Sequence, residues 1–186
     1  MRLFHLSDLH IGKRVNEFSM IEDQKYILER ILDLAEKEMP DGVILAGDIY
    51  DKQIPSAEAV QVFDEFITKL AERKFPVFVI SGNHDSAERL AFGGRLLNSR
   101  GIYLSPVYDG TVMKIPIADQ YGTVWIHLLP FIRPAAVRRV FEDESDLITD
   151  VQSAVRAVIS HMEIDPNERN ILVAHQFVTG ASRCES

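Results

Sequence analysis

The chain has 186 residues, of which 46% are hydrophobic and 26% charged, a balance typical of a globular protein and not of a disordered one. Its formal net charge of -8, taken alone, argues against a protein that binds nucleic acid through a broadly basic surface. A single cysteine, Cys184, excludes an internal disulfide framework. No apolar stretch has transmembrane length and charged residues interrupt the N-terminus, so we expect a cytoplasmic protein that binds no membrane.

The first half of the chain predicts alternating strands and helices. Apolar strands are expected at 2–7, 43–46 and 77–80, with a helix over 21–37 between the first two. Ser19 and Glu22 have the spacing of a capping box before that helix. Connections of this length join parallel strands through right-handed crossovers.

Two further helices are expected in this half. Pro55-Ser56 opens one of them, and another extends from Ser86 to about Asn98. The apolar residues on one face of the Pro55-Ser56 helix are Val60, Phe63, Phe66, Ile67 and Leu70.

The second half predicts antiparallel structure beside this parallel core. Strands are expected at 102–104, 111–117 and 123–129, the last two joined by 118–122 as a hairpin. A loop bounded by Pro130 and Pro134 leads to a helix over 147–159 and a last strand over 170–174. One mixed α/β domain over 1–186 is the simplest partition.

Four of the apolar strands end in residues of the kinds that bind metal ions. Ligands bind at the carboxyl edge of open α/β sheets, so we expect these side chains to converge there. Carboxylate, imidazole and amide ligands suit Mn²⁺, Zn²⁺, Fe²⁺ or Mg²⁺. The expected ligands are Asp8, His10, Asp48, Asn83 and His175.

These ligands divide between two ions. Asp8 and His10 alternate along extended chain, which would place both side chains on one face to chelate one ion. Asp48 has two oxygens and would bridge that ion to a second one held by Asn83 and His175. Two ions so placed can activate water and clamp the oxygens of an in-line phosphoryl displacement.

His84 directly follows a ligand, so its side chain is expected to point away from that of Asn83 and toward substrate. An imidazole in that position can stabilise or protonate the leaving oxygen. The sequence therefore predicts a hydrolase in which His84 is the catalytic residue.

Three motifs of this sequence resemble those of the calcineurin-like metallophosphoesterases: Asp8-x-His10, Gly47-Asp48-x-x-Asp51 and Gly82-Asn83-His84-Asp85. The opening Leu-Ser-Asp-Leu-His-Ile-Gly, Gly-Asn-His-Asp-Ser and the Leu-Pro-Phe-Ile-Arg-Pro segment look specifically like the SbcD-type nucleases of DNA double-strand-break repair. The likeness extends from Met1 to about Gly180.

The resemblance implies a layered β-sandwich flanked by helices. It also implies a nuclease with two divalent metal ions, usually Mn²⁺, that degrades duplex DNA from its ends and cuts single-stranded or hairpin DNA during repair and recombination. The implied partner is an SbcC-type coiled-coil ATPase, with the nuclease as a homodimer within a heterotetramer. Family roles assign Asp8, His10, Asp48, Asn83 and His175 to metal and His84 to catalysis.

The sequence departs from the family at one point. The family completes its site with a later Gly-His-x-His, and this chain has no histidine after His175, so we expect the N-terminal part of a nuclease domain. Two other functions stay open: a phosphoesterase acting on a small phosphoester such as a cyclic nucleotide, and an inactive scaffold that contacts an ATPase or its own copy.

Several polar residues near these motifs are expected to have structural roles. Asp51 and Asp85 are expected to cap loops or accept hydrogen bonds from backbone amides. His5 and His127 lie within predicted strands and are expected to be packed and hydrogen-bonded. His161 falls near a helix C-terminus, where an imidazole complements the helix dipole.

Overall fold

The apolar strands of the N-terminal half form one parallel sheet. The computed structural model describes residues 1–177, and within them the sheet has the order β1-β4-β5-β6. Its strands are β1 (Leu3–Leu6), β4 (Gly42–Ala46), β5 (Val77–Ile80) and β6 (Ile102–Leu104). Every residue of β4 and β5 is buried, which explains why these strands lack the alternation of a half-exposed strand. The predicted parallel strand–helix–strand units are confirmed.

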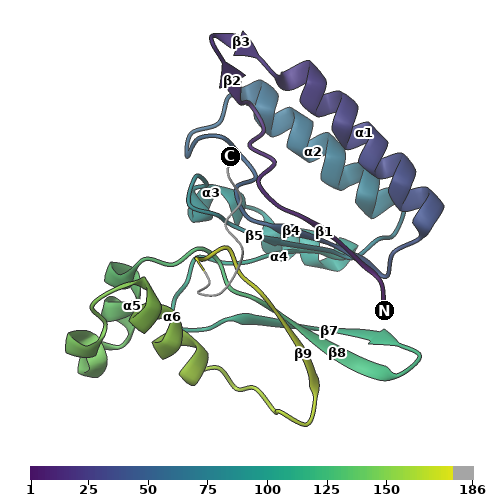
Figure 1. Cartoon of the computed structure of the whole chain (residues 1–186). Helices are drawn as coiled ribbons and strands as arrows, with labels where there is room; N and C mark the ends of the chain where they lie inside the picture. The colour runs from purple at the N-terminus through teal and green to yellow at the C-terminus, as the bar shows by residue number, and fades with distance from the viewer. Residues whose placement is uncertain (178–186) are drawn as a thin grey trace.

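Two long helices cover one face of this sheet (Figure 1). They are α1 (Ile21–Glu38) and α2 (Ala57–Glu72), and their apolar stripes pack on β4 and β5. Burying each Leu- or Phe-sized side chain stabilises the fold by roughly 1.5–3 kcal/mol. Packing of the two helices therefore stabilises this sheet.

A second sheet lies against the other face (Figure 1). It contains β7 (Met113–Asp119), β8 (Gly122–Leu128) and β9 (Arg169–Val173), with β7 antiparallel and β9 parallel to β8. Alternate residues Val124, Ile126 and Leu128 point inward and pack against Phe78 and Ile80. The layered β-sandwich flanked by helices is thus confirmed.

The connection from β8 to β9 forms a small helical unit of its own. It comprises α5 (Pro134–Val140), the 3₁₀ helix η2 (Glu142–Leu147) and α6 (Val151–Ser160). Residues of α5 and α6 share an apolar cluster with Leu129 and Ile132. An Asp150–Ser153 capping box starts α6. The crossover allows β9 to enter the sheet parallel to β8 and to end at the same edge as β4.

Several boundaries differ from those the sequence predicted. The Ser19–Glu22 capping box is wrong, because the N-cap of α1 is Met20, and Ser19 Oγ accepts from the N–H of Ile21 at 3.4 Å instead of from that of Glu22. The helix expected from Ser86 is broken into α3 (Ala87–Leu90), α4 (Gly94–Leu97) and the 3₁₀ helix η1 (Asn98–Arg100). Gly93 causes the first break, since its φ of 75° is left-handed.

Other differences concern turns and helix faces. The expected loop over 11–18 contains a short hairpin, β2 (Arg14–Val15) with β3 (Phe18–Ser19). The β7–β8 hairpin is tighter than predicted, because Asp119 already pairs with Gly122. On α2 the buried residue is Val62 and not Val60, which is 45% exposed.

No helix among residues 1–177 is both long and apolar enough to cross a membrane. Cys184 and the end of the family resemblance at Gly180 lie outside the described residues.

Candidate metal centre

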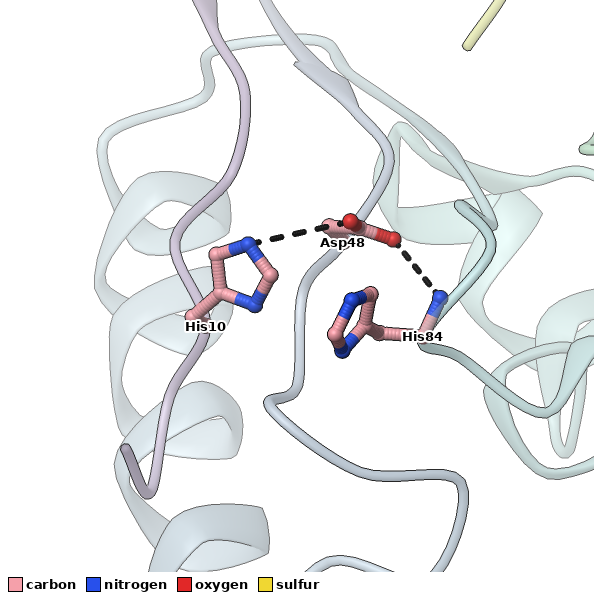
Figure 2. Close-up of side chains that lie close together, drawn as sticks. All are labelled: His10, Asp48 and His84. Atoms are coloured by element: carbon pink, nitrogen blue, oxygen red, sulfur yellow. Dashed lines mark hydrogen bonds and ion pairs between the residues drawn. The ribbon is translucent and has the colours of Figure 1, made fainter. Parts of the chain in front are cut away.

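The strand ends do converge at one edge of the first sheet. Two groups of side chains there have potential ligand atoms within 4.8 Å of one another. One group is His10, Asp48 and His84, and the other is Asp8, Asp48 and His175. Figure 2 shows the first group, in which segments following β1, β4 and β5 each contribute one side chain. Asp48 belongs to both groups.

The two oxygens of the Asp48 carboxylate face different partners. Oδ1 accepts a hydrogen bond from the backbone N–H of His84 at 2.9 Å (Figure 2). Oδ2 lies 3.7 Å from Nε2 of His10 and 3.4 Å from Nε2 of His175. Asp48 is only 3% exposed, so the surrounding residues restrict the movement of this carboxylate.

Asp8 lies near both groups. Its Oδ1 is 3.8 Å from Nε2 of His10, and a carboxylate oxygen also lies within the Asp48–His175 group. Asn83 and His175 line, together with Asp8, a hollow of about 300 Å³. Asp8 thus lies near His10 as well as His175, and the division of these ligands between two ions stays a prediction.

The backbone that brings Asp8 and His10 together is not extended, which corrects the reason given for their proximity. Strand β1 ends at Leu6, and Asp8, His10 and Asp48 have left-handed φ values of 57°, 43° and 49°. Hydrogen bonds from Asp8 N–H to Gly47 O (3.1 Å) and from His10 N–H to Asp48 O (2.9 Å) hold the two segments together. Such strained conformations cost roughly 1–3 kcal/mol each and concentrate at functional sites.

Two motif glycines make these approaches possible. A Cβ on Gly47 would lie 2.6 Å from Cγ of His175, and Gly47 also has a φ of +89°. A Cβ on Gly82 would overlap the Asp48 carboxylate and backbone. Each glycine therefore leaves room for one of the candidate ligands.

Backbone carbonyls determine the tautomers of two histidines. Nδ1 of His175 lies 2.7 Å from Ala46 O, and Nδ1 of His84 lies 2.9 Å from Asp51 O. Because a carbonyl only accepts, both Nδ1 atoms must donate, which leaves each Nε2 free as a ligand or proton carrier. The His84 ring also packs edge-on against His10, with centroids 4.7 Å apart.

The two motif aspartates that follow the ligands have different roles. Asp85 accepts backbone N–H groups of Ile49 (3.1 Å), Tyr50 (2.9 Å) and Gly82 (2.8 Å), so its predicted structural role is confirmed. Asp51 instead places Oδ1 3.7 Å from Nδ1 of His10, an atom that is buried and has no hydrogen-bond partner among residues 1–177.

Of the predictions made for three other histidines, two are confirmed and one is wrong. His127 is 2% exposed and contacts Asn170 Oδ1 through Nε2 at 2.9 Å, as expected of a packed histidine. His161 is the C-cap of α6, also as expected. His5 is exposed and lines the hollow beside Asp8, so the prediction that it is packed is wrong.

The sequence did not indicate that Phe131 lies at the site. It lines the same hollow, and its backbone N–H donates to Ser81 O at 2.9 Å. Phe131 follows the apolar strand β8 by a few residues, and that strand end was the signal available in the sequence.

Comparisons with known proteins identify a family and two similar nuclease subunits. Residues 1–185 match the model of the calcineurin-like phosphoesterase family. The SbcD subunits of nuclease SbcCD from Staphylococcus epidermidis and Staphylococcus saprophyticus are 35% and 34% identical over 189 positions. Both alignments cover 100% of this chain and 49% of the relative, so the chain spans about half the length of these curated relatives.

Among solved structures, Yfce, a phosphoesterase from E. coli, aligns with 69% of this chain and 56% of its own at 15% identity and a TM-score of 0.34. The family model, in contrast, covers nearly every residue of the chain. This chain belongs to the calcineurin-like phosphoesterase family.

Proposed function

We propose that this chain is the N-terminal part of the nuclease domain of an SbcD-type, metal-dependent DNA nuclease that hydrolyses phosphodiester bonds. The observation that carries the proposal is Asp48, whose buried Oδ2 faces Nε2 of both His10 and His175. The 35% identity to an SbcD nuclease over the whole chain supports the substrate class.

The residues present fit two divalent ions, for which we propose Mn²⁺. His10, Asp48 and Asp8 would hold one ion, and Asp48, Asn83 and His175 the other. When bound, such ions polarise the phosphodiester and make water a stronger nucleophile. The hydrogen bond from Nδ1 of His175 to Ala46 O leaves Nε2 as the ring nitrogen that faces Asp48.

We assign proton transfer to His84. Its Nδ1 hydrogen is committed to Asp51 O, so the second proton of the imidazolium resides on Nε2. The side chain is exposed beside the ligands, where substrate can reach it. In this proposal the Nε2–H donates to the departing oxygen and the ring becomes neutral.

Two cationic side chains beside the site are available to DNA phosphates despite the formal charge of -8, although Asp51 and Glu58 line the same hollow and balance their charge. Arg14 and Lys52 line a hollow of about 350 Å³ together with Asp51, on the His10 side of the site. Cationic side chains next to the site can contact phosphates that flank the scissile one. An SbcC-type ATPase partner is proposed from the name of the relatives, subunits D of nuclease SbcCD, and a homodimer within a heterotetramer is proposed from the family resemblance alone.

A phosphoesterase acting on a small phosphoester is the alternative that the acidic composition favours. An assay with Mn²⁺ distinguishes the DNA nuclease from this phosphoesterase by comparing the hydrolysis of single-stranded DNA, linear duplex DNA and a cyclic nucleotide. Both this chain and a longer form that includes a Gly-His-x-His segment are assayed. We expect DNA cleavage by the longer form at least. Turnover of the cyclic nucleotide without cleavage of DNA would reverse the assignment.

An inactive scaffold is the remaining alternative for the chain by itself. Titration calorimetry with Mn²⁺ tests it directly, because the proposed site predicts two binding events that Asp48→Asn weakens together. A chain that binds no Mn²⁺ would favour the scaffold.

A further inference from the structure

A second hollow, of about 300 Å³, adjoins the candidate metal centre. It lies between the loop after β5, the loop after β6 and the segment that leads into α5. Asn83 and Phe131 line both this hollow and the one that contains Asp8 and His175. A molecule bound across the metal centre could therefore extend into it.

The lining of this second hollow combines apolar surface with polar and charged side chains, among them Asn83, Asp85, Glu88 and Arg133. Phe131, Val107 and Ala136 provide apolar surface. Ser81 and Tyr108, only 2% and 9% exposed, have hydroxyl groups with no hydrogen-bond partner among residues 1–177. Burial raises the pKa of Tyr108 to about 12, so its phenol remains a donor at neutral pH. Unpaired buried hydroxyls are costly unless a ligand or water completes them.

We propose that this hollow is a nucleobase subsite for the nucleotide next to the scissile phosphate, an inference that rests on the proposed function. The flat faces of a base can pack against Phe131 and Val107. Its polar edge can form hydrogen bonds with the hydroxyls of Ser81 and Tyr108. Arg133, exposed at the same hollow, is available to the phosphate of that nucleotide. Stacking on an aromatic side chain accepts any base, so the subsite would bind DNA without reading sequence.

The subsite has a consequence for the substrate. A base inside a duplex cannot enter the hollow unless it leaves the stack and loses its partner. Unpaired nucleotides, such as those of frayed ends and hairpin loops, would therefore enter most readily.

The test compares thymidine 5′-monophosphate with 2-deoxyribose 5-phosphate, which lacks the base, by titration calorimetry at saturating Mn²⁺. The chain should bind the nucleotide about tenfold more tightly than the sugar phosphate. Ala136→Trp, which fills the hollow, should abolish that difference. Ala135→Trp, at the exposed neighbouring position outside the hollow, should retain it.

Tyr108→Phe removes only a hydroxyl and keeps the proposal testable if Ala136→Trp does not fold. It should reduce the preference for the nucleotide severalfold and leave sugar phosphate binding unchanged. Equal binding of the two compounds by the unaltered chain would overturn the subsite alone. Binding of neither compound would overturn the proposed phosphoester site, and the subsite with it.

Discussion

Nδ1 of His175 donates a hydrogen bond to the carbonyl oxygen of Ala46, 2.7 Å away, although the two residues are 129 positions apart in sequence. The bond joins the end of β9 in the second sheet to the end of β4 in the first. It orients Nε2 of His175 toward Asp48, at 3.4 Å. The metal centre proposed here thus depends on how the two sheets pack.

Gly47→Ala should displace His175, because the new Cβ would overlap its ring. We expect Mn²⁺ affinity to fall by about 10–100-fold, as when the support of a ligand is lost. Calorimetry measures this. Gly122→Ala is the matched control, since Gly122 also has a positive φ, +109°, but no atom within 4 Å of the new Cβ. An equal loss of Mn²⁺ affinity in both variants would contradict the role given to the close approach of Gly47 and His175.

Asp51→Ala should loosen His10, because Oδ1 of Asp51 lies 3.7 Å from its buried Nδ1, an ion-pair distance that is too long for a hydrogen bond. Carboxylate support of a metal-binding histidine is typically worth about tenfold or more in affinity. Calorimetry measures the loss of Mn²⁺ affinity, and the ¹⁵N chemical shifts of the His10 ring report any change in its tautomer. Asp51→Asn retains an acceptor oxygen and should recover part of the affinity. An unchanged His10 tautomer in the alanine variant would refute this contact.

His84→Gln should retain metal and lose cleavage. A longer form that cleaves DNA should lose about 10²–10⁴-fold in kcat in this variant, because His84 is the proposed proton donor. Because His84 also lies within 4.8 Å of the ligand atoms of His10 and Asp48, its metal affinity must be measured in parallel. His161→Gln, at the C-cap of α6, is the control. Full cleavage by His84→Gln would exclude the catalytic role.

Asp85→Asn should destabilise the fold itself. Its carboxylate accepts three backbone N–H groups while only 6% exposed, and the amide presents a donor to at least one of them. Buried donors left unpaired cost roughly 1–3 kcal/mol each, so the free energy of unfolding should fall by about 2–4 kcal/mol. Urea denaturation measures this, with Asp109→Asn in an exposed turn as the control. A loss as small as the control's would contradict the role given to Asp85.

Asp119 should make stability depend on acid pH. Its hydrogen bond with Arg169 holds the pKa of the carboxyl below its ordinary value. A depressed pKa means that the stabilisation is present above the ordinary pKa and is lost as pH falls through the folded-state value. Melting temperatures of the unaltered chain and Asp119→Asn should therefore differ at pH 7 and converge in acid. A constant difference across pH would refute the pair as its source.

The sequence was sufficient to predict the parallel core, because β4 and β5 are uninterrupted apolar runs and few other structures accommodate them. It was insufficient for α5, since Pro134 was interpreted as a loop boundary although proline is well tolerated in the first turn of a helix. The short hairpin β2–β3 was missed because strands of two residues are too short to show an alternation of apolar and polar residues.

The identities of the candidate ligands follow from the sequence alone. Each of the five follows an apolar strand: Asp8, His10, Asp48 and Asn83 follow strands of the first sheet, whose ends share an edge, and His175 follows β9 of the second sheet. Which ligands face one another was decided only by the tertiary structure. Left-handed backbone at Asp8, His10 and Asp48 turns these side chains away from where extended chain would place them, and packing between sheets brings His175 to Asp48. Alternation along a strand predicts neither effect, because both depend on contacts between segments far apart in the chain.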